Sequence, residues 1–462
     1  MTEFARIAVL DIGKTNAKVV VLDAATGQEI AAARMANRVV TNAPYPHYDV
    51  EALWAFTLDA LASFAIAPGY DAISVTTHGA SAALLEADGS LALPVLDYEH
   101  AYPQAVRDAY SALRPAFSQT LSPPLSGGLN LGAQLHYQKT SFPDAFSRVT
   151  DILTYPQYWV FRLTGVAANE VTSLGCHTDL WQPGRGDYSE LVDRLGIRAL
   201  MAPVRSAFDV LGPVSPDIAD RIGLCVPVFC GIHDSNASLL PHLVSRESPF
   251  SVVSTGTWVV SFAVGGNLSG LDPARDTLAN VDAHGRAVPS SRFMGGREFE
   301  MLTAGSPVPP QEKVEAAVRA MIAEGRMLLP SVVSGSGPFP EREQSHVGCK
   351  PGSAAETYAI TSLYAALMTD ACLDLLGAGG PTIVEGPFCE NSAYLRTLAS
   401  FTGRDVLAVS GSTGTSAGAA LLTGVHLPSA RSQAIEPLAD DRIQPYKLRW
   451  REHLGISMPV RC

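Results

Sequence analysis

The sequence is poor in charged residues and lacks any run rich in Lys and Arg. Charged residues make up 17% of the 462 positions, hydrophobic residues make up 47%, and the formal net charge is −12. Nucleic-acid binding rests mainly on basic patches that neutralise phosphates, so this composition disfavours a nucleic-acid partner. No uncharged apolar run approaches the roughly 18 residues that a membrane-spanning helix needs, so we expect no membrane partner either.

Several recurrent patterns are also missing. The seven cysteines are odd in number and none forms a C-x-x-C pair, which predicts free thiols in a reducing compartment. The N-terminal residues, MTEFARIAVLDIG, lack the basic and apolar regions of a signal peptide. We therefore expect a cytoplasmic protein. No G-x-x-x-x-G-K-[ST] segment occurs, which excludes a P-loop nucleotide site.

What is present is an alternation of strand and helix patterns that restarts halfway along the chain. At 462 residues, two large domains are the simplest count. Strand patterns cover residues 6–12, 17–23, 28–34, 71–79, 382–386 and 402–410, and 250–264 predicts strand, tight turn and strand. Helix patterns cover residues 49–66, 154–165, 354–376 and about 391–401, and residues 226–243 predict strand, loop and helix. This predicts an α/β protein duplicated in two halves, with domains at 1–245 and 246–430 and a tail at 431–462.

Each half opens with a hairpin whose turn suits phosphate binding. In the first turn, Gly13 tolerates a close backbone approach, Thr15 and Asn16 add donors, and Lys14 and Lys18 add positive charge. Asp11, at the end of the preceding strand, has the ligand type that magnesium prefers. An ordinary hairpin turn with an Asp at its edge is an equal alternative for this segment taken alone.

The second turn is Ser254-Thr255-Gly256-Thr257, again between apolar strands. Its hydroxyl and N–H groups suit another phosphate, although Ser/Thr turns are common. The equivalent position of the two hairpins in a duplicated chain favours the functional interpretation, with two phosphate clips facing each other across a cleft.

The loop from Gly231 to Asn236 follows a buried strand and precedes a helix, where α/β proteins place ligands. There Asp234 has the chemistry of a base that accepts a proton from a substrate hydroxyl attacking a γ-phosphate. A helix N-cap role for Asp234 or Ser235 is the alternative. His78, which Gly79 follows, could bind a sugar hydroxyl or be structural. The remaining histidines match no zinc spacing.

Taken together, these segments are specific even though each is weak. Asp11-x-Gly13-x-Thr15-Asn16, the GIHDSNAS loop, the STGTW hairpin and a late Gly-rich loop occur in the order found in the FGGY family of carbohydrate kinases, which the sequence resembles over residues 6–425. It resembles the rhamnulokinase and fuculokinase group most. The resemblance implies an actin-like ATPase fold, with two ribonuclease-H-like domains and a catalytic cleft between them.

The resemblance also implies roles for individual residues. Asp234 corresponds to the catalytic base and Asp11 to the magnesium-associated carboxylate. The sugar pocket would include His78, Gly79, His233 and Asp234, with Tyr98 and Glu99 from the segment where relatives carry an Arg/Asp-containing sugar motif. The phosphates and the nucleotide would be bound by Gly13, Lys14, Thr15, Asn16, Lys18, Thr255, Gly256, Thr257, Gly386, Asn391, Thr413 and Gly414.

The sequence departs from the family pattern in three places. Lys14 replaces a small residue or Thr, the sugar motif reads Tyr98-Glu99-His100, and Glu385, Pro387 and Phe388 replace glycines of the adenosine motif. The function implied is ATP- and Mg²⁺-dependent phosphorylation of a small sugar, a ketose of the rhamnulose, fuculose, ribulose or xylulose type, on a primary hydroxyl. A homodimer is common among such kinases. The alternatives are a non-catalytic regulatory protein of the same fold and a metal-dependent hydrolase.

Overall fold

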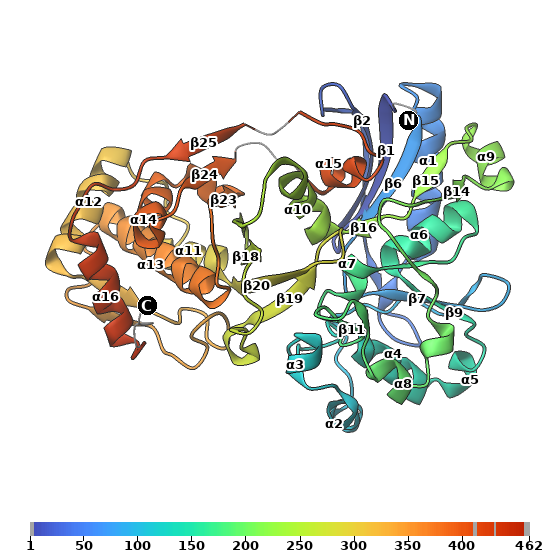
Figure 1. Cartoon of the computed structure of the whole chain (residues 1–462), viewed down its shortest axis with the longest axis horizontal. Coiled ribbons are helices and arrows are strands. Elements are labelled where there is room, and N and C mark those ends of the chain that lie inside the picture. Colours follow the sequence, from blue (N-terminus) through green and yellow to red (C-terminus); the bar gives the residue numbers. More distant parts are fainter. Residues whose placement is uncertain (1–3, 410–413, 429–430, 457–462) are drawn as a thin grey trace. The chain divides into compact units, whose positions relative to one another are not determined.

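The computed structural model describes residues 4–409, 414–428 and 431–456 (Figure 1). These residues form two compact units. Unit 1 comprises residues 4–246, 279–287 and 414–428, and unit 2 comprises 247–278, 288–409 and 431–456. Both units therefore contain segments from the C-terminal part of the sequence, which a simple division into consecutive halves does not predict.

Unit 1 is built on a mixed sheet with the order β14-β15-β6-β1-β2-β3, and β16 pairs additionally with β6. Its strands are β1 (Arg6–Ile12), β2 (Asn16–Asp23), β3 (Glu29–Ala36), β6 (Ala72–Thr77), β14 (Val210–Pro213), β15 (Pro227–Phe229) and β16 (Ile232–His233). The first three strands form an antiparallel meander, as the sequence predicts, and β6 runs parallel to β1. The apolar side chains of β1, β2 and β6 are almost entirely buried, whereas those of the edge strand β3 are half-buried or exposed.

The helices that pack on this sheet include α1 (Val50–Ile66), α6 (Tyr155–Thr164), α10 (Asp234–Ser245) and α15 (Gly414–Leu421). The predicted N-cap is confirmed, because the Asp49 carboxylate accepts a hydrogen bond from the Ala52 N–H at 3.1 Å. Gly165 ends α6 with φ of +76°, as a left-handed C-cap glycine does. A smaller sheet has the order β8-β7-β9, formed by β7 (Ala82–Leu85), β8 (Leu91–Leu93) and β9 (Asp151–Thr154). It lies in the same unit as α2 (Gln104–Leu113) and α4 (Leu131–Ser141).

The carboxyl ends of three strands meet at one edge of this sheet. In the parallel ladder of β1 and β6, Asp11 pairs with Thr76, and in that of β16 and β6, His233 pairs with Thr77. His78 follows directly, and its N–H donates to the Ile12 carbonyl at 2.9 Å. Residues that lie more than 200 positions apart in the sequence therefore share one edge, which is where open α/β sheets bind ligands.

Helix α15 brings the C-terminal segment of unit 1 against α10. A Cβ added at Gly418 would lie 1.7 Å from the Ala237 carbonyl oxygen, so only glycine permits this close crossing. The small-residue pattern after residue 414 is explained by this packing. The crossing also places the first turn of α15 beside β1.

Unit 2 has a sheet with the order β19-β20-β18-β17-β23-β24-β25. Its strands are β17 (Phe250–Thr255), β18 (Val259–Val264), β19 (Thr277–Val281), β20 (Ala287–Phe293), β23 (Thr382–Glu385), β24 (Val406–Val409) and β25 (Ser432–Ile435). The series β20-β18-β17 is antiparallel and β17-β23-β24 is parallel, which repeats the series β3-β2-β1 and β1-β6 of unit 1. The predicted α/β fold with two related halves is confirmed.

The core of unit 2 lies between this sheet and its helices. The helices are α11 (Gly295–Thr303), α12 (Gln311–Glu324), α13 (Ala354–Leu375), α14 (Ser392–Thr402) and α16 (Ile443–His453). Helix α16 falls in the segment expected to be a tail, yet Tyr446 and Trp450 are fully buried. Lys447 and Arg451 also bind the buried Asp370 of α13, so this helix belongs to the unit.

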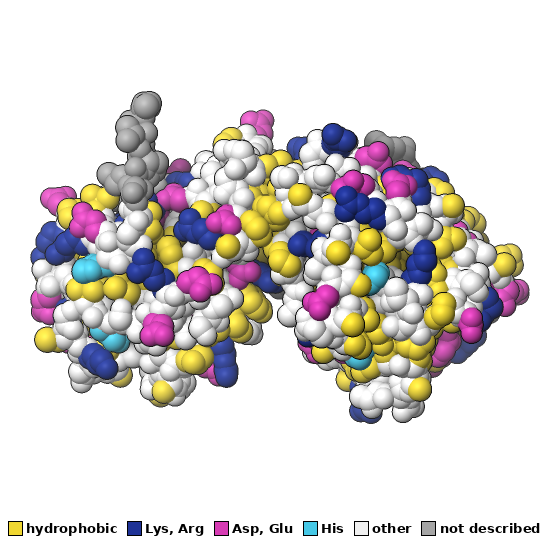
Figure 2. All heavy atoms as spheres, turned by 90° about the horizontal axis from the view of Figure 1, so that it is seen from below, with side chains coloured by type: hydrophobic (Ala, Val, Ile, Leu, Met, Phe, Trp, Pro, Cys, Tyr) yellow, Lys and Arg dark blue, Asp and Glu magenta, His cyan; other side chains and the backbone are white. Residues whose placement is uncertain are grey.

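The surface agrees with the low charge of the sequence. On the face drawn in Figure 2, the acidic and basic side chains of the described residues are interspersed, and neither kind forms a continuous patch. Among the helices of the described residues, none combines the length and the apolar composition needed to cross a membrane.

Candidate active site

Asp234 is the first residue of α10, and His233 is the N-cap of that helix. The N-cap role considered for Asp234 is therefore occupied by its neighbour. The Asp234 Oδ1 accepts a hydrogen bond from the Ser235 N–H at 2.6 Å and lies 3.1 Å from the His233 Nε2. The Asp234 side chain keeps 29% of its surface exposed. It is thus held in place on one side and accessible on another, as a base that meets a substrate must be.

His233 lies beneath Asp234 and is buried. A Cβ at Gly79 would lie 2.7 Å from the His233 Nε2, so the glycine makes room for the imidazole. The His233 N–H donates to the Thr172 hydroxyl at 3.0 Å, and its ring is hydrogen-bonded to the Cys176 thiol. Gly79 and His233, both predicted for the sugar pocket, therefore lie together next to Asp234.

These contacts set the charges at the site. Burial alone would raise the pKa of Asp234, but the hydrogen bond and the positive charge of His233 hold it below its ordinary value. Burial alone would lower the pKa of His233, but Cys176 and Asp234 raise it well above its ordinary range. Asp234 is therefore an ionised carboxylate beside an imidazolium at neutral pH.

Asp11 is 12% exposed at the end of β1 and is contacted by two hydroxyls of α15. The Thr415 hydroxyl donates to the Asp11 Oδ2, and the Ser416 hydroxyl donates to the same atom at 3.1 Å. The Lys18 ammonium lies 3.7 Å from this oxygen. Burial raises the pKa of Asp11 above its ordinary value, although Thr415 and Lys18 oppose the shift, and the charge of Asp234 raises it further. The two carboxylates are thus close enough to repel each other.

His78 is buried among aromatic rings. Its ring centroid lies 4.9 Å from those of Tyr48 and Tyr155 and 5.6 Å from that of Tyr98. Burial lowers the pKa of His78 to about 4, so its imidazole is neutral. The Nδ1 lies 2.9 Å from the Gly79 carbonyl, which can only accept, so Nδ1 carries the proton.

The turn between β1 and β2 leaves its polar groups accessible. The Gly13 N–H donates to the Asn16 carbonyl at 2.9 Å and closes the turn, and Thr15 and Asn16 are exposed at its tip. Lys14 points away from the tip, and its ammonium is bonded to Asp97 and lies 3.5 Å from a Glu99 oxygen.

The equivalent turn of unit 2 is uncharged. Gly256 and Thr257 are exposed, whereas Thr255 is buried and its hydroxyl donates to the Glu385 carbonyl and accepts from the Phe388 N–H at 3.1 Å. A Cβ at Gly386 would lie 2.0 Å from the Thr255 carbonyl oxygen. The predicted phosphate turn and the predicted adenosine segment therefore contact each other directly.

The other residues predicted to bind nucleotide have different surroundings. Asn391 is 4% exposed, and its side chain caps α14 by accepting from the Tyr394 N–H at 3.0 Å and donates to the Ser362 hydroxyl at 3.0 Å. Gly414 begins α15 in unit 1. Thr413 lies outside the described residues.

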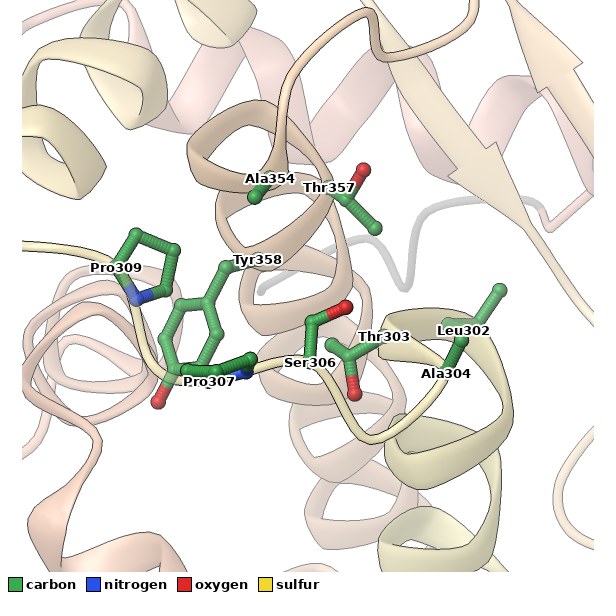
Figure 3. A pocket seen from close by; sticks show the side chains of 9 residues that line it. All are labelled: Leu302, Thr303, Ala304, Ser306, Pro307, Pro309, Ala354, Thr357 and Tyr358. Carbon is green, nitrogen blue, oxygen red and sulfur yellow. The ribbon is translucent and has the colours of Figure 1, made fainter.

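Unit 2 also contains a cavity of about 220 Å³ between the end of α11 and the start of α13 (Figure 3). The Tyr358 ring and two prolines of the loop after α11, Pro307 and Pro309, form part of its wall. The nine lining residues are those labelled in the figure. The ring centroid of Phe299 lies 5.2 Å from that of Tyr358 and 5.3 Å from that of Phe388. The cavity is therefore linked by one ring to the segment that follows Gly386.

Sequence reasoning missed several residues of the unit 1 site. Cys176 contacts His233, and although burial would raise the pKa of its thiol, His177 and His233 lower it to about 5. Glu170 is buried and accepts from the Thr172 hydroxyl and N–H, and burial raises its pKa to about 7. Only the three-dimensional structure reveals these contacts, because no motif spacing connects these residues with Asp234.

The Thr415 and Ser416 hydroxyls that contact Asp11 were also missed. Residues 414–418 read Gly-Thr-Ser-Ala-Gly, which is the G-x-S-x-G spacing of a serine-hydrolase nucleophile elbow. Here Ser416 is only 2% exposed, and its hydroxyl donates a hydrogen bond to the carboxylate of Asp11. The contact therefore orients Asp11 rather than activating a nucleophile.

The donor set fits magnesium bound chiefly through a substrate's phosphates. Among the described residues, no group of three or more His, Cys, Asp and Glu side chains is arranged to hold a metal ion. Mg²⁺ typically takes only one or two protein carboxylates and completes its shell with water and phosphate oxygens. The adjacent carboxylates Asp11 and Asp234 match that requirement.

The sequence matches known families over most of its length. Residues 6–241 match the N-terminal domain of the FGGY family of carbohydrate kinases, and residues 247–433 match a carbohydrate kinase FGGY C-terminal domain. A carbohydrate kinase from Novosphingobium aromaticivorans has a similar structure, with a TM-score of 0.90 and 38% identity over 96% of this chain and 99% of that one.

More distant relatives include named sugar kinases. L-fuculokinase of Salmonella typhi is 28% identical over 55% of each chain, and rhamnulokinase of Oceanobacillus iheyensis is 26% identical over 27% of each. The chain thus spans about half the length of the L-fuculokinase, and less of the rhamnulokinase. Xylulose kinase of Rhodospirillum rubrum shares the fold, with a TM-score of 0.81 at 18% identity.

Proposed function

Because the chain belongs to the FGGY family of carbohydrate kinases, we propose that it transfers the γ-phosphoryl group of ATP to a primary hydroxyl of a small ketose. The observation that carries this proposal is the geometry of Asp234. It is an ionised, partly exposed carboxylate at the carboxyl edge of a sheet, oriented by His233 and opposed by a second carboxylate, Asp11.

In the proposed reaction, Asp234 accepts the proton of the sugar hydroxyl as the hydroxyl oxygen attacks the γ-phosphorus. The bond from that phosphorus to the β,γ-bridging oxygen breaks, and ADP leaves with the electron pair. A base of low pKa suffices, because phosphoryl transfer passes through a loose transition state and depends mainly on position and charge stabilisation. The imidazolium of His233 keeps Asp234 unprotonated and correctly oriented.

We propose that unit 1 binds the sugar and the metal and that unit 2 binds the nucleotide. Asp11, with Asp234 nearby, would hold Mg²⁺, which neutralises charge on the phosphates when bound. The exposed turn at Gly13, Thr15 and Asn16, with Lys18, supports phosphate binding in unit 1. The turn at Thr255–Thr257 and the contact with Gly386 support nucleotide binding in unit 2.

The test is ADP release with Mg-ATP across a panel of L-fuculose, L-rhamnulose, L- and D-ribulose, L- and D-xylulose, erythrulose and glycerol. We expect turnover of one or a few ketoses and a loss of about 1,000-fold or more in kcat for Asp234→Ala, with Mg-ATP affinity unchanged. Asp209→Asn, which alters an exposed aspartate paired with Arg205, is the matched control.

Two outcomes would contradict the proposal. Normal turnover by Asp234→Ala would remove this residue as the base. Silence of the wild type across the panel, with Mg-ATP still bound, would favour the regulatory alternative. Location in the cytoplasm and assembly as a homodimer stay predictions from the sequence.

A further inference from the structure

The side chain of Lys14 is committed to a cluster on one side of the first hairpin. Its ammonium is bonded to an Asp97 oxygen and lies 3.5 Å from a Glu99 oxygen. It also lies 4.7 Å from the ring centroid of Tyr98 and 5.2 Å from that of Tyr48. Only 19% of the side chain is exposed. An ammonium with two carboxylates and two ring faces around it has little capacity left for a phosphate.

Asp97 is fixed from several directions, so it anchors Lys14 rather than following it. The residue is 6% exposed, and its carboxylate accepts from the Tyr48 hydroxyl at 3.3 Å and from the Glu99 N–H at 3.2 Å. Its own N–H donates to the Pro46 carbonyl at 3.0 Å. A carboxylate this deeply buried needs a cation, because an unpaired buried charge is strongly destabilising.

The cluster continues to His78 and from there to Asp234. The Tyr98 ring, under the Lys14 ammonium, meets the His78 ring edge-on at 5.6 Å between centroids. Because the His78 Nδ1 donates to the Gly79 carbonyl, the Nε2 keeps a free lone pair, and this buried atom has no partner among the described residues. A hydroxyl is the group that such an acceptor would bind. The charge of Asp234 also acts on His78.

We propose that Lys14 is a positioning residue for the acceptor sugar: paired with Asp97, it fixes the Tyr98 ring against His78 and so shapes the pocket wall next to the base. This inference rests on the proposed kinase function and refines it. The two lysines of one hairpin then have separate tasks, since Lys18 remains beside the metal carboxylate Asp11 and Lys14 serves the sugar.

The charges of the cluster also define the class of sugar. Four carboxylates, those of Asp97, Glu99, Asp234 and Asp11, face three cations at the site. The cations are the Lys14 and Lys18 ammonium groups and the His233 imidazolium, so one negative charge remains in excess. An anionic sugar such as an aldonate would be repelled. A neutral ketose or polyol can instead donate hydroxyls to the His78 Nε2 and to Asp234.

The experiment compares Lys14→Met with Lys18→Met in the full-length protein. The readouts are kcat and KM for the ketose that the wild type uses best, the KM for ATP, and the Kd for Mg-ATP by calorimetry. For Lys14→Met we expect about a 10-fold higher ketose KM and an unchanged Mg-ATP Kd. For Lys18→Met we expect an unchanged ketose KM and a higher Kd for Mg-ATP. D-gluconate, the anionic probe, should give no turnover with the wild type.

Further variants keep the test decisive if Lys14→Met folds poorly. Lys14→Arg, which retains the charge, should preserve most of the ketose affinity. Lys14→Met combined with Asp97→Asn should recover folding and part of the ketose affinity, since the buried carboxylate no longer lacks a cation. Glu99→Gln, at an exposed carboxylate of the cluster, should raise the ketose KM less than Lys14→Met does.

Each remaining result counts against the inference. A Mg-ATP Kd raised 10-fold or more in Lys14→Met would make Lys14 a phosphate ligand, and an unchanged ketose KM would remove it from the sugar pocket. Faster turnover of D-gluconate than of any ketose would overturn the charge argument. Failure of the wild type on every panel sugar would refute the kinase proposal, and with it this inference, without reference to any variant.

Discussion

The turns of β1–β2 and β17–β18 occupy equivalent positions in two related sheets, yet they differ in chemistry. The first is surrounded by charge, with Asp11, Lys14 and Lys18 within eight residues and each one paired. The second presents Thr255, Gly256 and Thr257, and its contacts are hydrogen bonds with the backbone at Glu385 and Phe388. One topology therefore supports an electrostatic site in unit 1 and a backbone-lined site in unit 2.

The difference agrees with the proposed division of the reaction between the two units. A metal, a proton and a sugar hydroxyl require carboxylates, imidazoles and their partners, and these occur at the sheet edge of unit 1. A nucleotide can be bound by N–H groups and glycines that permit close approach, and these occur at the turn of unit 2. Substitutions in the two turns should therefore fail in different ways.

The largest effect is expected at the charge of the first turn. Asp11→Asn keeps a side chain of the same shape but removes the negative charge that would hold Mg²⁺. We expect kcat to fall on the order of 1,000-fold, while the affinity for ATP without magnesium stays unchanged. Steady-state kinetics over a magnesium titration measures this. Asp23→Asn, at the other end of the same hairpin, should remain fully active, and equal losses in both variants would contradict the charge argument.

In the second turn, we expect substitutions to act through steric clashes rather than through a loss of charge. Gly386 has φ of +84° and ψ of −163°, a region almost reserved for glycine, and a Cβ there would lie 2.0 Å from the Thr255 carbonyl oxygen. We expect Gly386→Ala to lower the free energy of unfolding by about 3 kcal/mol and to weaken Mg-ATP binding. Urea denaturation and calorimetry are the measurements.

The control for this steric argument is Gly403→Ala in the same unit. Gly403 also has a left-handed φ, of +65°, but a Cβ there meets nothing within 4 Å. Its substitution should cost about 1 kcal/mol and leave Mg-ATP binding intact. If both variants lose equal stability, the close approach of Gly386 to Thr255 has no energetic weight.

A smaller effect concerns the buried acid beneath the first site. The pKa of Glu170 is about 7 when folded, against 4.5 for an unperturbed glutamate, so the folded state binds more protons between these pH values. Stability from this group is therefore present at low pH and is lost as pH rises through 7. Between pH 5 and 7 the loss should be about 2 kcal/mol.

Glu170→Gln should abolish this pH dependence, which thermal unfolding from pH 5 to 8 can measure. Asp49→Asn, at an exposed helix cap of the same unit, is the control and should retain the wild-type slope. A wild-type slope in Glu170→Gln would mean that another group titrates.

The sequence predicts the fold well because its signals are local. Alternating apolar residues, the Asp49 cap and the glycines after helices fix strands and helices without tertiary information. The turns at Gly13 and Gly256 and the loop at Asp234 are predictable for the same reason. The C-terminal helix was missed because α16 is polar on average and acquires its place only through Tyr446, Trp450 and the ion pairs with Asp370.

The site is less predictable because its partners come from distant segments. Cys176 and Glu170 lie near Asp234 only because the folded chain brings their segment against His233. No motif spacing in the sequence indicates this proximity. Lys14 looks like a phosphate ligand in sequence, since it lies in a phosphate turn. Its pairing with Asp97 depends on a segment 83 positions later in the sequence returning to the same place.

The crossing of α10 and α15 has a consequence for biosynthesis. Helix α15 contacts β1 and β6, its Ala419 carbonyl accepts from the Ser74 hydroxyl at 2.7 Å, and its hydroxyls orient Asp11. Yet residues 414–428 leave the ribosome after almost all of unit 2. Unit 1, which begins the chain, is therefore not completed until most of unit 2 has been synthesised, and until then the nascent protein exposes the apolar faces of β1 and α10 that a chaperone would bind.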